Sequence, residues 1–221
     1  MARSPDPAVS ENFERQGRFE LKHRAILEAA ERLFLDNGYL GTKMEELAAI
    51  ARVSKPTIYT HFGSKESLFV ELVSSMTSAA GDKVHLRADE PALNGDVERY
   101  LRDYAERQLG VVLTPRLLQL RRLVIGEVSR FPELARALYV NGPQRAIGSL
   151  AAAFEQLHSR GLLHIDDAVT AATQFNWLVM GGPMNEAMLL GDMAVPSPAM
   201  LRRHAQASAR VFVAAYGARK Q

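Results

Sequence analysis

The sequence predicts an all-α fold. Apolar residues recur at steps of three and four along most of the chain, and no stretch alternates apolar and polar residues for long enough to form a strand. Capping residues and prolines separate the periodic segments, as expected for consecutive helices. With 221 residues and an apolar content of 47%, the chain can bury a full core.

The first helix is expected to follow a flexible arm. Residues 1–18 are polar, contain two prolines and show no apolar period. The helical period starts at Leu21 and continues to Asn37-Gly38, which should end the helix with a left-handed cap. The apolar stripe of this helix consists of Ile26, Ala29, Ala30, Leu33 and Phe34.

Three further helices should follow. Thr42 is expected to cap the first of them, with Glu45 completing a capping box. Ser54 should cap the second, which carries a proline in its first turn and stops at Gly63. Ser64 should start the third, which we expect to be long.

The remainder of the chain also has a helical pattern. Residues 88–95 carry proline and glycine and are expected to form a connector. Six helices should follow, and Gly181-Gly182-Pro183 should interrupt or bend the fifth. Their predicted ranges are 96–113, 115–130, 132–141, 143–161, 166–190 and 198–217.

Composition and motifs argue against an enzyme or a metalloprotein. The chain has no cysteine, which excludes disulfides, a thiol nucleophile and thiolate metal sites. Its six histidines lack metal-binding spacing, and Asp166-Asp167 is typical of a helix cap. The motifs GxSxG and GxGxxG and the P-loop are absent. We therefore expect no catalytic residue, no metal and no cofactor.

The chain is expected to be a soluble cytoplasmic protein. No apolar run reaches the roughly 18 residues that a membrane span needs, and the N-terminal segment lacks the apolar core of a secretory signal. The net charge of +2 is a weak indication of nucleic-acid binding. Because residues 1–80 hold ten Lys and Arg against eleven Asp and Glu, any electrostatic footprint must be local.

The most informative segment is residues 42–68, which predicts two short helices joined by a tight turn and followed by a third helix. In the second short helix, Ile58 and Phe62 face the core, whereas Lys55 and Tyr59 lie on a different face. This pattern is typical of a helix-turn-helix, which lays a helix in the DNA major groove. Hydroxyls and cations suit phosphates, and an aromatic ring suits the sugar and methyl surface. The candidate DNA-binding residues are Thr42, Lys43, Arg52, Ser54, Lys55, Pro56, Thr57, Tyr59, Thr60, His61 and Lys65.

The segment from Ile26 to Phe69 resembles the TetR/AcrR family of bacterial transcriptional regulators. The matching positions are Gly38-Tyr39, Thr42, Val53-Ser54, Ile58-Tyr59, His61-Phe62 and Lys65. Arg52 departs from the pattern, because the family usually has glycine in this turn. Arginine there implies either a turn that needs no positive φ or mild strain, and it can add a phosphate contact.

The resemblance implies which residues approach bases, which approach the DNA backbone, and how the chain is divided into domains. Residues matching Lys55, Pro56 and Tyr59 approach bases in relatives, and those matching Thr42, Thr57, His61 and Lys65 approach the DNA backbone. The segment from Arg121 to Gly161 resembles the C-terminal domain of AefR-like members. The implied organisation is a flexible arm at 1–18, a helix-turn-helix domain at 19–63, a linking helix at 64–84, and an effector-binding and dimerisation domain at 85–221.

We therefore expect a ligand-responsive regulator, more often a repressor than an activator. It should bind a near-palindromic double-stranded DNA operator as a homodimer, with its recognition helices in major grooves roughly 34–36 Å apart. The dimer should form through the last two long helices, whose small and apolar residues are Ala168, Ala171, Ala172, Ala205, Ala209 and Val213. Two alternatives remain: a helical enzyme, and a ligand-independent DNA-bound adaptor or architectural protein of the same fold.

The effector should be a small, largely apolar molecule that releases the DNA. Candidate ligand-binding residues are Tyr104, Leu120, Val124, Val128, Asn141, Phe154, Phe175 and Val179. Core packing is the alternative role for most apolar candidates, which also include Trp177, Met180, Met184 and Met188. Possible polar anchors are Asn141, Gln144, Gln174 and Asn176.

Overall fold

The structure is a computed structural model that describes residues 7–85 and 96–218. Its described part is helical, apart from turns and an isolated antiparallel bridge between Leu163 and Gly217, so the all-α prediction is confirmed. The chain divides into two compact units, residues 1–72 and residues 73–221. The predicted connector at 88–95 lies outside the described residues.

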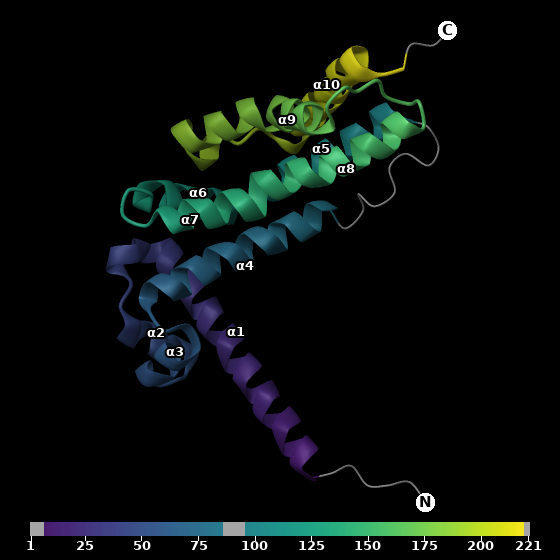
Figure 1. Ribbon diagram of the computed structural model, residues 1–221. Coiled ribbons are helices and arrows are strands. Elements are labelled where there is room, and N and C mark those ends of the chain that lie inside the picture. Colours follow the sequence, from purple (N-terminus) through teal and green to yellow (C-terminus); the bar gives the residue numbers. More distant parts are fainter. Residues whose placement is uncertain (1–6, 86–95, 219–221) are drawn as a thin grey trace, which may run out of the picture. The chain divides into compact units, whose positions relative to one another are not determined.

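The first unit contains the predicted helix-turn-helix (Figure 1). Its helices are α1 (Pro7–Gly41), α2 (Met44–Ala51), α3 (Lys55–Phe62) and the first turns of α4 (Lys65–His85). Helix α4 therefore belongs to both units, since its later turns follow the boundary at residue 72.

The expected arm is helical in its described part. Helix α1 begins at Pro7, so residues 7–18 of the expected flexible arm are helical although they show no apolar period. The physical reason is that this segment is rich in Glu, Arg and Gln, which favour helix without supplying an apolar stripe. Residues 1–6 lie outside the described part.

The turn after α1 confirms one prediction and corrects two others. The helix does break at Gly38, as predicted, but the φ of 72° and ψ of 177° of this residue are not those of a left-handed helical cap. Thr42, however, does not cap α2: Lys43 occupies the N-cap position and makes no side-chain cap hydrogen bond. The Thr42 side chain is buried and its hydroxyl donates toward the carbonyl oxygens of Leu33 (3.0 Å) and Gly38 (2.8 Å). It therefore fastens the end of α1.

The turn between α2 and α3 places an arginine in a left-handed conformation. Arg52 has φ 55° and ψ 41°, so of the two alternatives the strained turn is the observed one. Its backbone N–H donates to the carbonyl of Ala49 (3.2 Å), and that of Val53 donates to the carbonyl of Ala48 (3.0 Å). These bonds close α2 in a way that a glycine would satisfy without strain.

An apolar core holds the first unit together. Ile26, Leu47 and Ile58 come from three different helices and are fully buried. The ring of Phe69 stacks on Phe34 with 4.7 Å between centroids, which joins α4 to α1. The unit is therefore a small helical bundle whose parts are all held by their apolar faces.

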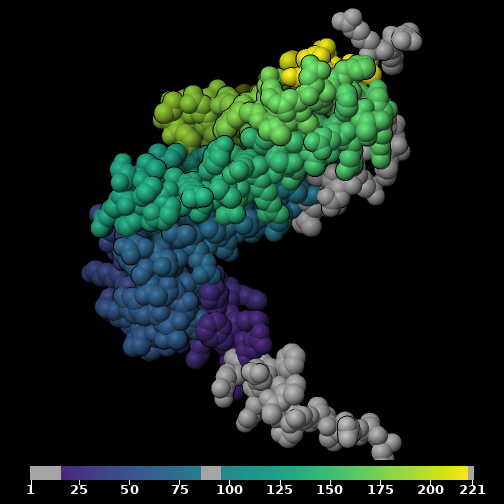
Figure 2. Space-filling model, in the orientation of Figure 1, coloured from purple at the N-terminus to yellow at the C-terminus, as the bar shows by residue number. Residues whose placement is uncertain are grey.

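The second unit contains the remaining helices. Helix α8 lies along α9, and α10 lies along α5 (Figure 1). In the space-filling view, α8 and α9 form the green surface (Figure 2). The elements are α5 (Val97–Val112), α6 (Pro115–Glu127), α7 (Pro132–Tyr139), the π-helical turn η1 (Val140–Gln144), α8 (Arg145–Ser159), α9 (Ala168–Leu190), the 3-10 turn η2 (Asp192–Ala194) and α10 (Pro198–Tyr216).

Two predicted breaks in this unit are absent. Asn141-Gly142 does not end a helix, because the turn η1 carries the chain from α7 into α8 and accommodates Pro143 in its wider spacing. Helix α9 also continues through Gly181-Gly182-Pro183, so of the predicted interruption or bend the interruption is absent. Glycine marked a possible stop in both places, but neither stretch has the positive φ that a glycine cap uses.

The predicted dimer-interface alanines lie inside the second unit. Ala171 and Ala172 of α9 and Ala205 and Ala209 of α10 are fully buried in its core, so they are unavailable to a second copy. Ala168 and Val213 pack partly against the same core. Small residues let neighbouring helices approach closely, and this chain uses them within one protomer.

We predict that Arg52→Gly stabilises the first unit by about 0.5–1 kcal/mol, because it removes the strain of a left-handed non-glycine residue. The midpoint of urea unfolding measures the effect. Arg52→Ala is the matched control, since it removes the same side chain but keeps the strained φ. A gain in stability for Arg52→Ala as large as that for Arg52→Gly would contradict this explanation.

Candidate functional site

Helix α3 presents one polar face and buries the other. Ile58 is fully buried and Phe62 is 7% exposed, whereas Tyr59 is 39% exposed. The Ser54 hydroxyl accepts a hydrogen bond from the backbone N–H of Thr57 (3.2 Å), which confirms the predicted cap. The outer side chains line a shallow hollow formed by Lys55, Pro56, Tyr59 and Thr60.

Lys55 already has an acidic partner. Its ammonium donates to the Glu45 carboxylate at 2.6 Å, and both side chains are exposed. The pair raises the pKa of Lys55 and lowers that of Glu45, mainly through this hydrogen bond. A phosphate that approaches Lys55 must therefore compete with Glu45.

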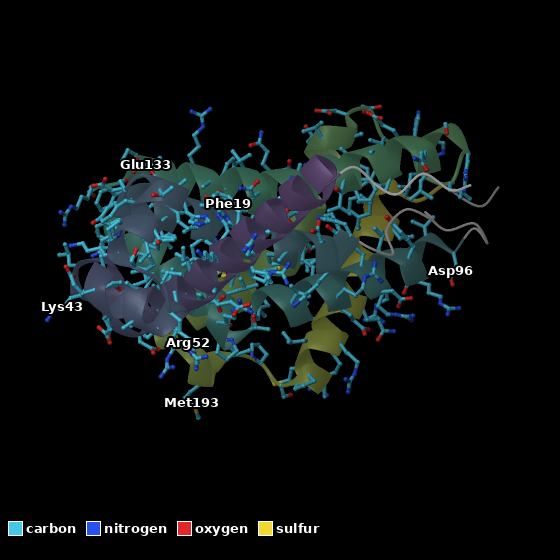
Figure 3. The ribbon with its side chains drawn as sticks, turned by 90° about the horizontal axis from the view of Figure 1, so that it is seen from below. Phe19, Lys43, Arg52, Asp96, Glu133 and Met193 are labelled. Carbon is cyan, nitrogen blue, oxygen red and sulfur yellow. The ribbon has the colours of Figure 1, made fainter. Side chains whose placement is uncertain are left out.

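Lys65 is also engaged within the first unit. Its ammonium donates to the backbone carbonyl of Thr42 at 2.6 Å and lies 4.6 Å from the centre of the Tyr39 ring. An ammonium has three N–H donors, so an additional bond to a phosphate is compatible with this position. Lys43 and Arg52 lie at opposite ends of α2 and are exposed (Figure 3).

His61 packs against α1. Its ring stacks on Phe19 with 4.0 Å between centroids and lies 5.8 Å from the ring of His23. Burial lowers the pKa of His61, and the nearby His23 and Lys22 lower it further. His61 is therefore neutral at pH 7, and the predicted phosphate contact would use a neutral N–H donor.

The second unit contains a hollow of about 80 Å³. Its polar wall includes Gln108 and Asn176, which are both buried and joined by a 2.8 Å hydrogen bond from Gln108 Nε2 to Asn176 Oδ1. We call this hollow the α4–α9 cavity. Its lining residues are Thr77, Ala80, Gly81, Val84, His85, Gln108, Val112, Leu117, Arg121, Leu138, Gly142, Pro143, Ala146, Asn176, Trp177, Met180 and Met184.

None of the eight candidate ligand-binding residues lines the α4–α9 cavity. Five of them fill the core instead, each at most 1% exposed: Tyr104, Leu120, Phe154, Phe175 and Val179. Val124 and Val128 line an adjoining hollow beside α7, which shares Arg121, Leu138 and Pro143 with the cavity. Asn141 is partly exposed in η1. Of the other residues considered, Asn176, Trp177, Met180 and Met184 do line the cavity, whereas Met188, Gln144 and Gln174 do not.

Sequence reasoning missed Arg121 and Gln108. Arg121 stands four residues after Leu117 and three before Val124, so a charge interrupts an apolar row. Gln108 similarly stands four residues before Val112, on the buried face of α5. A polar residue at a position where the helical period expects an apolar one could have marked both residues as candidates in the sequence.

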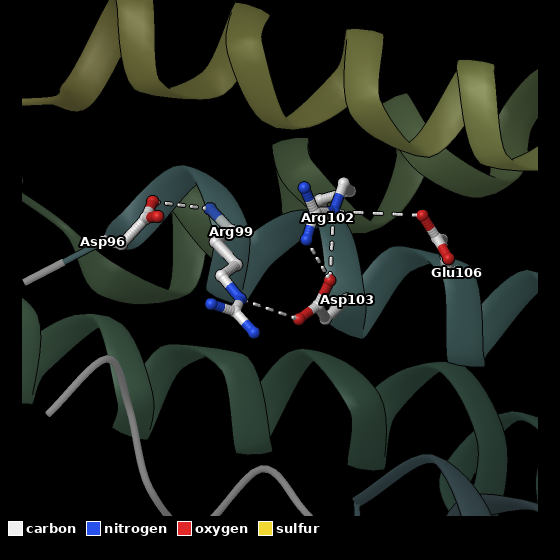
Figure 4. Close-up of polar contacts among 5 residues, drawn as sticks. All are labelled: Asp96, Arg99, Arg102, Asp103 and Glu106. Carbon is white, nitrogen blue, oxygen red and sulfur yellow. Dashed lines mark hydrogen bonds and ion pairs between the residues drawn. The ribbon is translucent and has the colours of Figure 1, made fainter. Parts of the chain in front are cut away.

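The other notable charges of this unit have partners. On α5, Arg102 contacts Asp103 (2.7 Å) and Glu106 (3.9 Å), and Arg99 contacts Asp103 (3.8 Å; Figure 4). These exposed pairs raise the pKa of Arg102 and contribute little to stability. Within the described residues, no group of three or more potential metal ligands and no helix able to cross a membrane is found.

Comparison with known proteins identifies the family. The model for bacterial regulatory proteins of the TetR family matches residues 26–72, and that for the C-terminal domain of AefR-like transcriptional repressors matches residues 99–218. This chain belongs to the TetR family. TetR-family members are non-enzymatic DNA-binding transcriptional regulators, typically repressors, so the alternative of a helical enzyme is excluded.

Individual relatives agree with the assignment. A solved structure from Mesorhizobium loti described as a TetR-family transcriptional regulator is 40% identical, with a TM-score of 0.85 over 90% of this chain and 98% of that one. The flavonoid-responsive regulator FrrA is 31% identical, with a TM-score of 0.75 over the same shares of the two chains. The transcriptional repressor NicS of Pseudomonas putida is 29% identical over 66% of this chain and 68% of its own length. The transcriptional regulator YhgD of Bacillus subtilis is 40% identical, but the match covers only 33% of this chain and 37% of YhgD.

We predict that the first unit loses stability as the pH falls. The folded-state pKa of His61 lies below its unfolded value near 6.5, so the unfolded chain takes up the proton first and stability declines as pH falls through the folded pKa. The urea midpoint should therefore fall more for the native chain than for His61→Gln between about pH 7 and about pH 5.5. Equal losses in the two proteins would contradict this role of His61.

Glu45→Gln should strengthen DNA binding by about twofold to fivefold and steepen its dependence on salt, because it releases Lys55 to a phosphate. Fluorescence anisotropy over a range of salt concentrations measures both quantities. Glu46→Gln is the matched control: it removes the same charge from the next residue of α2, and Glu46 is exposed. Equal effects of the two variants would indicate general repulsion and not competition for Lys55.

Proposed function

We propose that this chain is a ligand-responsive repressor that binds a near-palindromic operator as a homodimer. The observation that carries the proposal is the two-sided helix α3, whose buried Ile58 and Phe62 fix the position of an outer face bearing Lys55 and Tyr59. A helix held in this way can enter a major groove without rearranging. It acts on bacterial DNA, which makes the cytoplasm its place of action.

Different residues serve different parts of the DNA in this proposal. Lys55, Pro56 and Tyr59 approach base edges from the outer face of α3. Thr57, His61 and Lys65 approach the backbone, together with Lys43, Arg52, Ser54 and Thr60 around them. Thr42 contributes through backbone amide groups near it, since its hydroxyl is committed to the end of α1.

The dimer is proposed to form through exposed apolar side chains of α9 and α10, in place of the buried alanines. Leu178 and Leu189 lie eleven residues apart, on one face of α9, and are 38% and 74% exposed. Met200 and Val211 have the same spacing on α10 and are 52% and 57% exposed. Two copies that cover these faces would remove a substantial apolar area from water.

Ligand response is proposed to act through α4. Thr77, Gly81 and Val84 of this helix line the α4–α9 cavity, and its first turns belong to the DNA-binding unit. An effector that binds better to one position of α4 shifts the population toward that position and so changes the spacing of the two recognition helices. The name of FrrA, a flavonoid-responsive relative, supports a response to a small molecule.

The test is binding of the purified chain to the DNA upstream of its own coding sequence. We expect a dimer by sedimentation and a preference for this DNA over a scrambled duplex. Tyr59→Ala should weaken operator binding by about 1–3 kcal/mol if the ring contacts bases. Val211→Glu should yield monomers that lose operator affinity, because a charge at the proposed interface opposes association.

Ile125→Glu is the control for Val211→Glu, since Ile125 is also exposed (54%) but lies on α6. Loss of the dimer in both variants would remove α10 as the interface. Adding a flavonoid, the class to which FrrA responds, tests release from DNA. If no small molecule changes operator affinity, the chain is a ligand-independent DNA-bound protein of this fold.

A further inference from the structure

Two neighbouring arginines of α6 have opposite environments. Arg122 donates to the Asp192 carboxylate (2.6 Å) and to the Ala187 carbonyl (3.3 Å). Arg121 lines the α4–α9 cavity, and no hydrogen bond or ion pair joins it to another described residue. Burial lowers the pKa of Arg121, although a guanidinium stays protonated at pH 7. A cation thus lies in the cavity wall with no counter-charge from the described part of the chain.

Partial burial of an unpaired guanidinium carries a free-energy cost, which a bound anion would offset. Removing a charge from water is costly, and the cost is recovered when an opposite charge and hydrogen bonds replace the lost water. The planar guanidinium offers five N–H donors in a fixed fork, which fits a carboxylate with two parallel bonds. No acidic side chain is present among the described residues that line the cavity. A ligand carboxylate would supply the counter-charge that the described lining residues lack.

The rest of the cavity determines what the anion is attached to. Val84, Leu117 and Met180 give most of the wall an apolar character. Gln108 Oε1 is buried and has no hydrogen-bond partner, whereas the side-chain nitrogen of Gln108 donates to Asn176. An acceptor left in this state favours a ligand that carries a donor as well as an acid group.

From these contacts we propose that the effector is a small amphipathic anion. Its carboxylate binds Arg121, its apolar body lies among Val84, Leu117 and Met180, and a donor group on the body satisfies Gln108. This inference rests on the proposed effector site and adds the chemical class of its ligand. The hollow of about 80 Å³ is smaller than the roughly 150 Å³ cavity that holds a benzene ring, so flexible Met180 and Met184 must move to admit a ring.

The chain carries its own probe for this proposal. Trp177 is the single tryptophan of the sequence and lines the cavity. Its fluorescence can be followed in titrations of the full-length protein with benzoate and with benzamide, which share a ring. Only benzoate carries a charge for Arg121, and only benzamide carries an N–H donor for Gln108. We expect benzoate to change the fluorescence at millimolar or lower concentration and to bind about tenfold or more tightly than benzamide, the contribution expected of a charged hydrogen bond.

Two variants separate the cavity from general charge effects. Arg121→Gln should abolish the preference for benzoate, whereas Arg122→Gln should retain it, although both remove one positive charge from the same helix. Arg121→Gln should also leave the unliganded melting temperature unchanged or raised, because it removes a partly buried charge that no described residue pairs with. A folded variant is therefore available for the comparison.

The possible results test the anionic class of the ligand and the release of DNA separately. Equal binding of benzoate and benzamide, equal loss in the two arginine variants, or no fluorescence response to either compound would overturn the anionic class. The proposed function is tested separately by adding the same two compounds to the protein–operator complex. Benzoate that binds at Arg121 without releasing DNA would count against effector-driven release alone. Release by benzamide as effective as by benzoate would count against the anionic class alone.

Discussion

The DNA-binding unit depends on the burial of one face of an eight-residue helix. A helix as short as α3 has too few internal hydrogen bonds to persist by itself in water. Ile58 and Phe62 supply the missing stability by packing into the core formed with α1, α2 and α4. Burial of these two side chains fixes the orientation of α3 and therefore the positions of its outer side chains. The Ser54 cap adds a local constraint, but it could not hold the helix alone.

Two candidate DNA-binding cations of this unit have partners within the chain before any DNA binds. Lys55 is paired with Glu45, and Lys65 is bonded to the Thr42 carbonyl and lies over the Tyr39 ring. DNA binding in such a unit exchanges partners as well as adding them, so the affinity gained per cation is lower than for a free lysine. This agrees with a region whose acidic and basic residues nearly balance. Selectivity must then depend on shape and base contacts more than on bulk charge.

In the second unit, the informative residues are buried polar groups and not surface charges. Its helices bury long apolar rows, and the informative positions are the few where a polar group replaces an apolar one. Gln108 and Asn176 satisfy each other in part, whereas Arg121 has no partner in the described chain. A helical core tolerates such groups at a free-energy cost, and a ligand that supplies the complement recovers it. In the proposed function, the same chemistry couples ligand binding to the position of α4.

The sequence by itself determined the helix order, most caps and the buried face of α3, because these depend on contacts within a few residues. Ser54, Gly63 and Asp167 fulfilled their predicted capping or terminating roles for this reason. Tertiary packing decided what local patterns leave open. It turned Thr42 inward, buried the alanines of α9 and α10 within one protomer, and filled the core with Phe154 and Phe175 while bringing Arg121 to a cavity. Which of several apolar faces meets another helix, and where space remains, depends on residues far apart in the chain.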